Sequence, residues 1–570
     1  MLQIKNLRID FETEQGTHTA VHDISFNVNP GEIVAVVGES GSGKSVTALS
    51  ILQLLPKKTA RYTNGHIFFT QKDQVPVDLL KATPRYLRSV RGSRIAMIFQ
   101  EPMTSLNPVF TCGHQVMEAI LQHHTITAAA AKQQVLALFE KVQLPNPALL
   151  FNRYPHQLSG GQKQRVMIAM AMSGSPSLLI CDEPTTALDV TVQKTILQLI
   201  KKLQQDTGMG VIFITHDFGV VAEIADRVLV MYKGNIVEQA AVQDLMQRPQ
   251  HAYTRGLLAC RPVLHAKGER LPVVSDFLQN DAAFRAAGEN PLIRDYASAD
   301  IADTNLLLRE KLIEVHQLKV WYPGKKNFLG KPADYTKAVD DVSFDVYTGE
   351  TLGLVGESGC GKTTLGRALL RLVEPTGGEI IFRGNSLLQY STADLRRLRK
   401  EIQIIFQDPY SALNPSITIG NAIQEVLQVH GLLASARQRK EKVMELLQKV
   451  SLQAEHFNRY PHEFSGGQRQ RIVIARALAL NPSFIVCDES VSALDVSVQA
   501  QVLNLLNDLK KEFRFTIIFI SHDLSVVHYI SDRIMVMQKG KIVETGTAAQ
   551  VYQHPGEEYT QRLIASIPKT

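Results

Sequence analysis

Two short stretches of the chain have the residue types and spacing that bind phosphate. Residues 38–45 read GESGSGKS and residues 356–363 read GESGCGKT, so both fit the pattern G-x-x-x-x-G-K-S/T. An apolar stretch typical of a strand precedes each one and an apolar stretch typical of a helix follows, as this pattern requires. Glycines let backbone N–H groups surround phosphate oxygens, and the helix N-terminus adds positive potential. Because one chance match in this length is expected on the order of 0.02 times, two matches predict two nucleotide sites.

A lysine and a hydroxyl side chain complete each of these loops. Lys44 and Lys362 should reach the β- and γ-phosphates of a nucleotide, and the hydroxyls of Ser45 and Thr363 should ligate Mg²⁺. The loop residues expected to bind nucleotide are Gly38, Glu39, Ser40, Gly41, Ser42, Gly43, Lys44 and Ser45 in the first loop, and Gly356, Glu357, Ser358, Gly359, Cys360, Gly361, Lys362, Thr363 and Thr364 in the second.

Two acidic pairs stand downstream, each at the end of an apolar strand, in SLLICDE and SFIVCDE. Asp182 and Asp488 suit a position beside Mg²⁺, and Glu183 and Glu489 could polarise an attacking water. Alone, such a pair more often caps a helix. Its placement behind a phosphate loop in both halves favours hydrolytic chemistry instead.

The elements that must position these residues occur twice. The stretch GEIVAVVGESGSGKS returns as GETLGLVGESGCGKT, and RYPHQLSGGQKQR returns as RYPHEFSGGQRQR. The offset between the copies is 318 at the phosphate loops (38 against 356) and 306 at the acidic pairs (182 against 488), so insertions cluster early in each copy. In both copies the order of strands, glycine turn, helices and apolar strands predicts an α/β fold with a mainly parallel sheet and an inserted helical subdomain.

The end of the first copy follows from its last matching segment. Tyr253 and Thr254 match Tyr559 and Thr560 at the same offset of 306 (253 against 559). We therefore predict a first domain at 1–260, a linker at 261–310 and a second domain at 311–570. The predicted linker has six Lys or Arg and eight Asp or Glu residues and no counterpart after the second copy, which is typical of a surface tether.

Composition narrows the class of protein. Of 570 residues, 45% are hydrophobic and 20% are charged, as in ordinary folded chains. Lys and Arg number 61 against 55 Asp and Glu, without a basic block, so we expect no nucleic-acid partner. Because there is no apolar run of 18 residues and the first residues lack the features of a signal peptide, we expect a cytoplasmic chain. Five cysteines without a C-x-x-C pair speak against a disulfide framework and structural zinc.

Between each phosphate loop and its acidic pair lies the sequence SGGQ. Together with the other motifs it resembles the signature of ATP-binding cassette (ABC) ATPases. The resemblance covers 1–260 and 311–570, and it implies two P-loop NTPase domains with RecA-like sheets, each with an antiparallel β subdomain and a helical signature subdomain. It also implies ATP and Mg²⁺ as cofactors. The signature residues that would contact nucleotide are Ser159, Gly160, Gly161 and Gln162, and Ser465, Gly466, Gly467 and Gln468.

The resemblance also implies roles for single residues, which group by chemistry. The catalytic set would be Glu183, Glu489, the switch histidines His216 and His522, and the Q-loop residues Gln100 and Gln407. The metal set would be Ser45, Gln100, Asp182, Thr363, Gln407 and Asp488. The remaining nucleotide contacts would be the D-loop residues Asp189 and Asp495 and the aromatic residues Phe11 and Tyr322, which would stack on adenine.

In this family the nucleotide lies between the P-loop of one domain and the signature of the other, so the resemblance implies that the two domains pair within the chain. Both copies keep the glutamate and the histidine, which predicts two hydrolysing sites. Departures from the family pattern are mild. Phe464 stands where the first copy has Leu158, and the segment SVS at 490–492 replaces PTT at 184–186. These differences leave open whether the two sites turn over equally.

The partner of such an ATPase is indicated by other stretches. IFQEPMTSLNPVF, IFQDPYSALNPSI, RYPHQLSGGQ and ALDVTVQ resemble the peptide/nickel import family of bacteria. This resemblance implies two transmembrane permease subunits, a solute-binding protein and a peripheral position on the cytoplasmic face of the inner membrane. Among fused members, the glutathione importers are the most similar, and oligopeptide, dipeptide and microcin C importers are alternatives. Only Cys260 stands in the tail where several relatives carry four cysteines, so we expect no iron-sulfur cluster.

Two other functions compete with import. Soluble translation factors of the ABC family also fuse two cassettes, but their linker is basic, whereas the segment 261–310 has more acidic than basic residues, the wrong sign for approaching RNA. DNA-repair ABC ATPases would need inserted zinc modules, for which the cysteine pairs are missing. The sequence therefore favours an importer ATPase.

Overall fold

The computed structural model describes residues 1–13, 16–71, 74–100, 105–186, 188–279, 309–324 and 334–567. The chain divides into two units. The first contains Met1–Leu258 and helix α12 (Val274–Gln279), and the second contains Ala259–Val273 and the described residues from 309 onward. The boundaries at 260 and 310 stay predictions, and residues 280–308 of the predicted linker lie outside the described residues.

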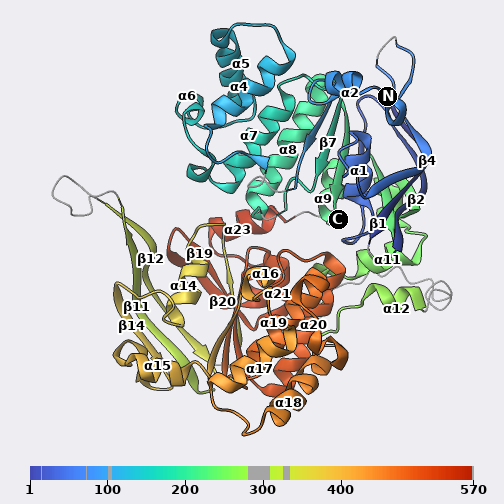
Figure 1. Cartoon of the computed structure of the whole chain (residues 1–570). Helices are drawn as coiled ribbons and strands as arrows, with labels where there is room; N and C mark the ends of the chain where they lie inside the picture. Colours follow the sequence, from blue (N-terminus) through green and yellow to red (C-terminus); the bar gives the residue numbers. More distant parts are fainter. Residues whose placement is uncertain are drawn as a thin grey trace. The chain divides into compact units, whose positions relative to one another are not determined.

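The first unit contains two sheets (Figure 1). An antiparallel sheet has the order β2-β1-β4-β5, and a second sheet has the order β10-β9-β3-β8-β7-β6, in which only β10 runs antiparallel to its neighbour. The strands are β1 (Leu2–Thr13), β2 (Gly16–Val28), β3 (Ile33–Val37), β4 (Ala60–Phe69), β5 (Val77–Asp78), β6 (Ile95–Ile98), β7 (Leu178–Asp182), β8 (Gly210–Thr215), β9 (Arg227–Tyr232) and β10 (Asn235–Ala241).

The parallel strands are apolar on both faces because helices or the antiparallel sheet cover each side. Strand β3 has the sequence IVAVV and is buried throughout. Its residues alternate between two core clusters, since Ile33 packs with the helical layer and Val34 packs with the antiparallel sheet. The continuous apolar runs seen in the sequence are thus central strands of a layered domain.

The helices of the first unit lie on both sides of the mainly parallel sheet. Between β6 and β7 the chain forms the inserted helical subdomain, which was expected from the sequence. The helices of the unit are α1 (Lys44–Ile51), α2 (Pro84–Val90), α4 (Cys112–His123), α5 (Ala128–Lys141), α6 (Pro147–Phe151), α7 (Gly160–Met172), α8 (Val190–Thr207), α9 (Phe218–Ile224), α10 (Val242–Gln247), α11 (Ala252–Ala259) and α12.

The second unit repeats this architecture. Its antiparallel sheet has the order β12-β11-β14-β15, and its mainly parallel sheet has the order β16-β17-β18-β13-β19-β20. The prediction of two α/β P-loop domains in tandem is confirmed. The strands are β11 (Lys311–Pro323), β12 (Tyr335–Tyr347), β13 (Thr351–Val355), β14 (Gly377–Phe382), β15 (Asn385–Ser386), β16 (Ile402–Ile405), β17 (Phe484–Asp488), β18 (Thr516–Ser521), β19 (Arg533–Gln538) and β20 (Lys541–Thr547).

The helices of the second unit correspond to those of the first. Long helices follow the same strands, so that α20 occupies the place of α8 and α14 the place of α1. The helices are α14 (Lys362–Leu369), α15 (Thr392–Leu398), α16 (Pro409–Ala412), α17 (Ile419–Val429), α18 (Ala436–Lys449), α19 (Gly466–Leu478), α20 (Val496–Phe513), α21 (Leu524–Ile530), α22 (Ala548–Gln553) and α23 (Glu558–Ala565).

The strand order brings the predicted functional residues to one edge of each parallel sheet. In the first unit β3 pairs with β8 and β8 pairs with β7, all in parallel, so their carboxyl ends meet. The phosphate loop, the acidic pair and His216 follow those three ends, which is where ligands bind in open α/β sheets. Within the described residues, no helix has the length and hydropathy needed to cross a bilayer.

Candidate active site

The phosphate loops owe their shape to glycines with positive φ. Gly38 has φ of 155° and Gly43 has φ of 99°. A Cβ at Gly38 would lie 2.2 Å from the carbonyl oxygen of Met231, and one at Gly43 would lie 2.8 Å from that of Ala20. Neighbouring backbone therefore excludes any side chain at both positions, and the loop wraps around the N-terminus of α1.

The loop lysines are buried against their own loops. Lys44 is 5% exposed, and its ammonium donates to the carbonyl oxygens of Gly38 at 2.7 Å and Glu39 at 2.9 Å. Lys362 donates to Gly356 and Glu357 at the same two distances. Each ammonium is thus held at the centre of a ring of backbone groups, where it can face phosphate oxygens.

The loop hydroxyls meet the first acid of each pair. Ser45 Oγ donates to Asp182 Oδ1 at 2.9 Å, and Thr363 Oγ1 donates to Asp488 Oδ1 at 2.9 Å. Burial raises the pKa of both aspartates. A hydroxyl and a carboxylate oxygen side by side fit Mg²⁺, which prefers one or two protein oxygens together with phosphate and water oxygens.

Glu183 stands at the turn after β7 in the left-handed conformation, with φ of 47°. Its Oε2 accepts from Gln100 Nε2 at 3.1 Å and from Thr186 Oγ1 at 2.9 Å, and it lies 3.5 Å from His216 Nδ1. Burial raises the pKa of this carboxyl, but His216, Lys44 and Thr186 together outweigh burial and lower it to about 2. The predicted catalytic glutamate, Q-loop glutamine and switch histidine therefore converge on one carboxylate.

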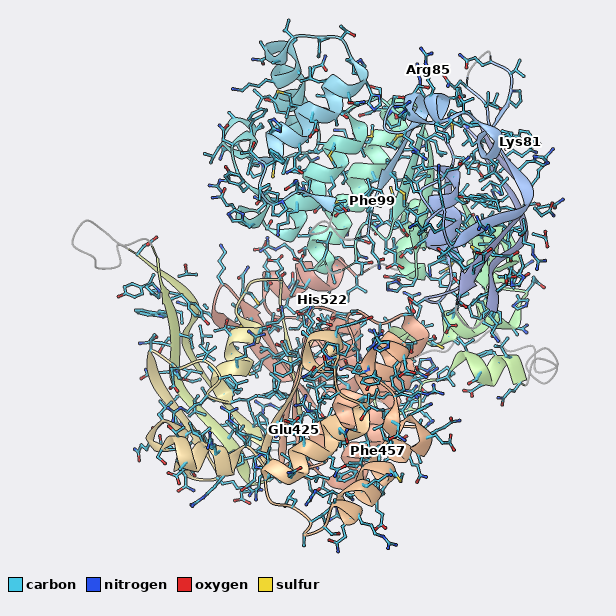
Figure 2. The ribbon with its side chains drawn as sticks, viewed as in Figure 1. Lys81, Arg85, Phe99, Glu425, Phe457 and His522 are labelled. Atoms are coloured by element: carbon cyan, nitrogen blue, oxygen red, sulfur yellow. The ribbon has the colours of Figure 1, made fainter. Side chains whose placement is uncertain are left out.

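Glu489 repeats the arrangement with one difference. Its φ is 48°, and its Oε2 accepts from Gln407 Nε2 at 3.0 Å and lies 3.4 Å from His522 Nδ1. Figure 2 labels His522, which follows β18. Burial raises the pKa of Glu489, and His522 and Lys362 outweigh it and lower it. Ser492, in the place of Thr186, donates to the backbone carbonyl of Glu489 at 2.8 Å and not to its carboxylate.

Two family models match the chain. The ABC transporter model covers residues 21–186 and 339–492, which is more than half of the chain. The chain belongs to the ABC transporter family. Its cassettes bind ATP, and it is an ATPase. A second model, the oligopeptide/dipeptide transporter C-terminal region, covers residues 237–282 and so includes part of the predicted linker.

Known relatives of this ABC ATPase match it over its full length. The glutathione import ATP-binding proteins GsiA of Pectobacterium atrosepticum and of Escherichia coli (strain K12) are each 49% identical over 100% of this chain and 89% of their own. A solved dimeric ATP-binding cassette, bound to ADP and phosphate after hydrolysis, is 26% identical over 41% of this chain and 98% of its own, with a TM-score of 0.38.

The ABC signatures begin helices of the inserted subdomains. Ser159 caps α7, where its hydroxyl accepts from the backbone N–H of Gln162 at 3.3 Å and the Gln162 side chain accepts from the N–H of Ser159. Ser465 and Gln468 form the same capping box on α19. Both serines are exposed, so each signature presents a helix N-terminus that can meet an anion.

The ABC D-loop aspartates start the long helices. Asp189 caps α8 and accepts from the N–H of Val192 at 2.9 Å and from Thr191 Oγ1 at 2.7 Å. Asp495 is the N-cap residue of α20. Nothing in the structure tests their contact with nucleotide, so that role stays a prediction.

The proposed adenine contacts lie on the antiparallel sheets. Phe11 on β1 is half-buried and packs against the core, which limits how much of its ring can stack on a base. Tyr322 on β11 is 41% exposed. The neighbouring Trp321 contacts Tyr335 and lies 4.5 Å below the ammonium of Lys337. The adenine role of Phe11 and Tyr322 stays a prediction.

Sequence reasoning missed two tyrosines that touch the phosphate loops. Tyr253 OH accepts from the backbone N–H of Glu39 at 2.9 Å, and Tyr559 OH accepts from that of Glu357 at 3.0 Å. The signal was present, because Tyr253 and Tyr559 recur at the common offset. From the sequence alone, this recurrence predicts only the end of each domain.

Proposed function

We propose that this ABC ATPase is the energy-coupling subunit of an importer for glutathione or a related small peptide, and that it hydrolyses ATP at two sites. The observation that carries the import function is the full-length identity of 49% to glutathione import proteins. The match of residues 237–282 to a region of oligopeptide/dipeptide transporters supports it independently. The same relatives disfavour the translation-factor function.

The geometry supports a direct role for the glutamates in hydrolysis. Water attacks the γ-phosphorus of ATP, and the bond to the β-phosphate oxygen breaks to give ADP and phosphate. With a pKa of about 2, Glu183 is ionised at neutral pH and can accept a hydrogen bond from that water. Lys44 would neutralise charge on the phosphates, and His216 would hold the γ-phosphate.

Magnesium would be held by the oxygen pair of each loop. Ser45 and Asp182 in the first unit, and Thr363 and Asp488 in the second, are the residues that would bind it. Gln100 and Gln407 follow the edge strands and already reach the same carboxylates as the histidines. When bound, the ion would neutralise charge that develops on the phosphates.

The second unit offers a surface for a permease. A cavity of about 380 Å³ lies along α17 and the loop before it, and its lining includes Asn414, Asn421, Gln428 and Arg476. Figure 2 labels Glu425, a further lining residue on α17. The cavity follows the Q-loop segment that resembles the permease-docking region of importers. We place a cytoplasmic segment of one transmembrane permease subunit here.

The first unit exposes apolar side chains in the equivalent stretch. Phe99 is 40% exposed, Val109 is 70% exposed and Phe110 is 45% exposed. Such residues are expected to be covered by a partner. We place a second permease subunit on these exposed residues of the first unit, and a solute-binding protein on the opposite side of the membrane. The chain would then be peripheral on the cytoplasmic face of the bacterial inner membrane.

Uptake of labelled glutathione tests the function. A strain that lacks this chain should regain glutathione uptake with the wild type and not with Glu183→Gln/Glu489→Gln, because the double variant retains binding but loses hydrolysis. Unlabelled dialanine as competitor separates a glutathione importer from a dipeptide importer. Uptake that is the same with and without the chain would refute the proposal.

Capture of the tagged chain from solubilised cells tests the partners. The expected companions are two polytopic permeases and a solute-binding protein, and Asn421→Arg/Gln428→Arg should lose a permease while keeping ATPase activity. The control is Arg437→Glu on α18, whose side chain is exposed. Capture of ribosomal proteins without permeases would contradict the import function and favour the translation-factor function.

A further inference from the structure

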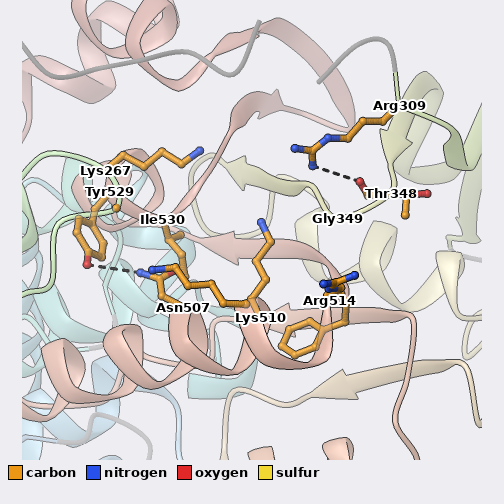
Figure 3. Close-up of a pocket in the computed structure, with 12 residues that line it drawn as sticks. Lys267, Arg309, Thr348, Gly349, Asn507, Lys510, Arg514, Tyr529 and Ile530 are labelled. Atoms are coloured by element: carbon orange, nitrogen blue, oxygen red, sulfur yellow. Dashed lines mark hydrogen bonds between the residues drawn. The ribbon is translucent and has the colours of Figure 1, made fainter. Parts of the chain in front are cut away.

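A second concave site lies in the second unit, away from the phosphate loop. Its volume is about 500 Å³, which is in the range of pockets for small organic ligands. The walls come from the segment Ala259–Val273, Arg309, the turn at 348–349, the C-terminal half of α20 with the two residues that follow it, and the end of α21. Figure 3 shows their side chains around the cavity.

The lining is strongly basic. Among the described residues that line the cavity none carries a carboxylate and five are cationic: Lys267, Arg309, Lys510, Lys511 and Arg514. Behind the wall, Asp532 accepts from Lys267 and from Lys510 at 3.4 Å, and the charge of the buried Glu350 also acts on Lys510. The described residues that line the cavity therefore carry an excess of positive charge.

The ammonium group of Lys510 is held in a fixed, mostly buried position. Its side chain is only 22% exposed, and its ammonium donates to Thr351 Oγ1 at 2.6 Å. Burial, together with the charge of Lys267, lowers the pKa of this lysine. Asp532 and Glu350 act in the opposite direction but do not outweigh burial and Lys267, so the fold compensates the charge of Lys510 only in part.

The first unit provides an internal comparison, because α8 and α20 match at an offset of 306. The positions of Lys510, Lys511 and Arg514 are held by Gln204, Gln205 and Gly208. Gly208 and Arg514 are the C-cap residues of α8 and α20, and both have positive φ, 66° for Gly208 and 56° for Arg514. The second unit accepts an arginine in a conformation that favours glycine. The cations are therefore not needed to make the fold.

The cavity is separate from the ATP site. Thr351, which Lys510 contacts, is the first residue of β13, whereas the phosphate loop follows the last residue of that strand. Five residues of strand span roughly 16 Å. The turn that contains Gly349 lies at the same far end, and Arg309 donates to the carbonyl of Thr348 there at 3.4 Å.

We propose that this cavity binds a small organic anion that carries at least two carboxylate or phosphate groups. The guanidinium groups of Arg309 and Arg514 can each pair with a planar or tetrahedral anion through two N–H groups. The apolar part of such a ligand would contact Phe515, Tyr529 and Ile530, which also line the cavity. Because Lys267 belongs to the segment between the cassettes, the ligand would hold that segment on the second cassette.

Calorimetric titration of the full chain tests this site. Tricarballylate probes carboxylates and pyrophosphate probes phosphates, with the ATP sites saturated by MgADP and ionic strength held constant with KCl. Lys511→Gln/Arg514→Asn should weaken binding about tenfold or more, since two charge-assisted contacts are lost. The matched control is Lys201→Gln/Lys202→Gln on α8, which removes the same charge from the other unit and should bind as the wild type does.

A second readout locates the ligand. Binding should slow hydrogen exchange in residues 259–273 of the wild type, and the Lys511→Gln/Arg514→Asn variant should lose this protection. Arg309→Gln serves as a second variant, from the opposite wall, with the same expected loss. If neither anion binds, if the α8 control loses as much affinity, or if residues 259–273 gain no protection, the proposed site is refuted. The stronger of the two probes names the anionic group.

Discussion

The hydroxyl of Tyr253 accepts a hydrogen bond from the backbone N–H of Glu39 at 2.9 Å, across 214 positions of sequence. Tyr253 is fully buried on α11 and its ring packs on Tyr232 at 4.3 Å between centroids. The second unit repeats the bond between Tyr559 and Glu357. The tail of each cassette thus holds the phosphate loop from outside, and the tyrosine acts as a positioning residue.

Tyr253→Phe should weaken ATP binding at the first loop. The substitution removes one hydrogen bond that orients the loop, which corresponds to a rise in KM for ATP of about two- to tenfold with a smaller change in kcat. ATPase assays in a Glu489→Gln background report on the site that contains Glu183. Tyr559→Phe in a Glu183→Gln background should give the same result, and Tyr335→Phe, an exposed tyrosine, is the control. An unchanged KM in both would exclude the positioning role.

Glu183→Gln and Glu489→Gln should each abolish one hydrolysing site. The double variant should lose about 100-fold or more in ATPase rate, because no carboxylate remains to orient water. Each single variant should keep the activity of the other site and trap ATP at its own. Filter-binding of labelled nucleotide and steady-state ATPase measure the two effects. A single variant with full activity would mean that its site contributes no turnover.

Substitutions at Thr186 and Ser492, each three positions after the catalytic glutamate, should change the hydrolysis rates of the two sites by different amounts. Thr186→Val removes a hydrogen bond to the carboxylate of Glu183 and should slow the first site about two- to tenfold. Ser492→Ala removes a bond to the backbone carbonyl of Glu489 and should leave the chemical step of the second site close to the wild-type rate. Single-turnover assays in Glu489→Gln and Glu183→Gln backgrounds separate them. Equal effects would contradict the asymmetry.

Acid should remove the contribution of Glu183 to stability. Its pKa in the folded chain, about 2, lies below the usual value of about 4.3, so the ionised carboxylate stabilises the fold above the usual pKa. This contribution is lost as pH falls from about 5 towards 2. The gap in Tm between the wild type and Glu183→Gln should therefore shrink over that range. Glu441→Gln, at an exposed carboxylate, should show no such change.

The predicted pairing of the two cassettes can be tested at their signatures. In a Glu489→Gln background, Ser465→Arg should abolish the remaining ATPase activity, because the signature of the second copy would complete the site of Lys44. Ser159→Arg in the same background should leave that activity in place. Steady-state ATPase measures both. The reverse pattern would show that each cassette uses its own signature.

Much of this protein follows from its sequence. The motifs that identify the functional residues are local: the phosphate loops, the acidic strand ends and the signatures. Lys44 and Ser159, for example, form hydrogen bonds with residues that lie within six positions of them in the sequence. Short-range geometry of this kind repeats wherever a strand, a glycine turn and a helix occur in that order. The duplication of the motifs then predicts two copies of one α/β domain, and both sheets of each copy confirm it.

Other features depend on the tertiary structure. The strand order β8-β7-β6 decides that Glu183 meets both His216 and Gln100, although the sequence could suggest each of them singly. The different partners of Thr186 and Ser492, the bond from Tyr253 to the phosphate loop, and the basic cavity join residues that no motif relates. The positions of these residues depend on how strands and helices pack against one another. Packing sums many weak contacts over the whole unit, and no local sequence pattern contains that sum.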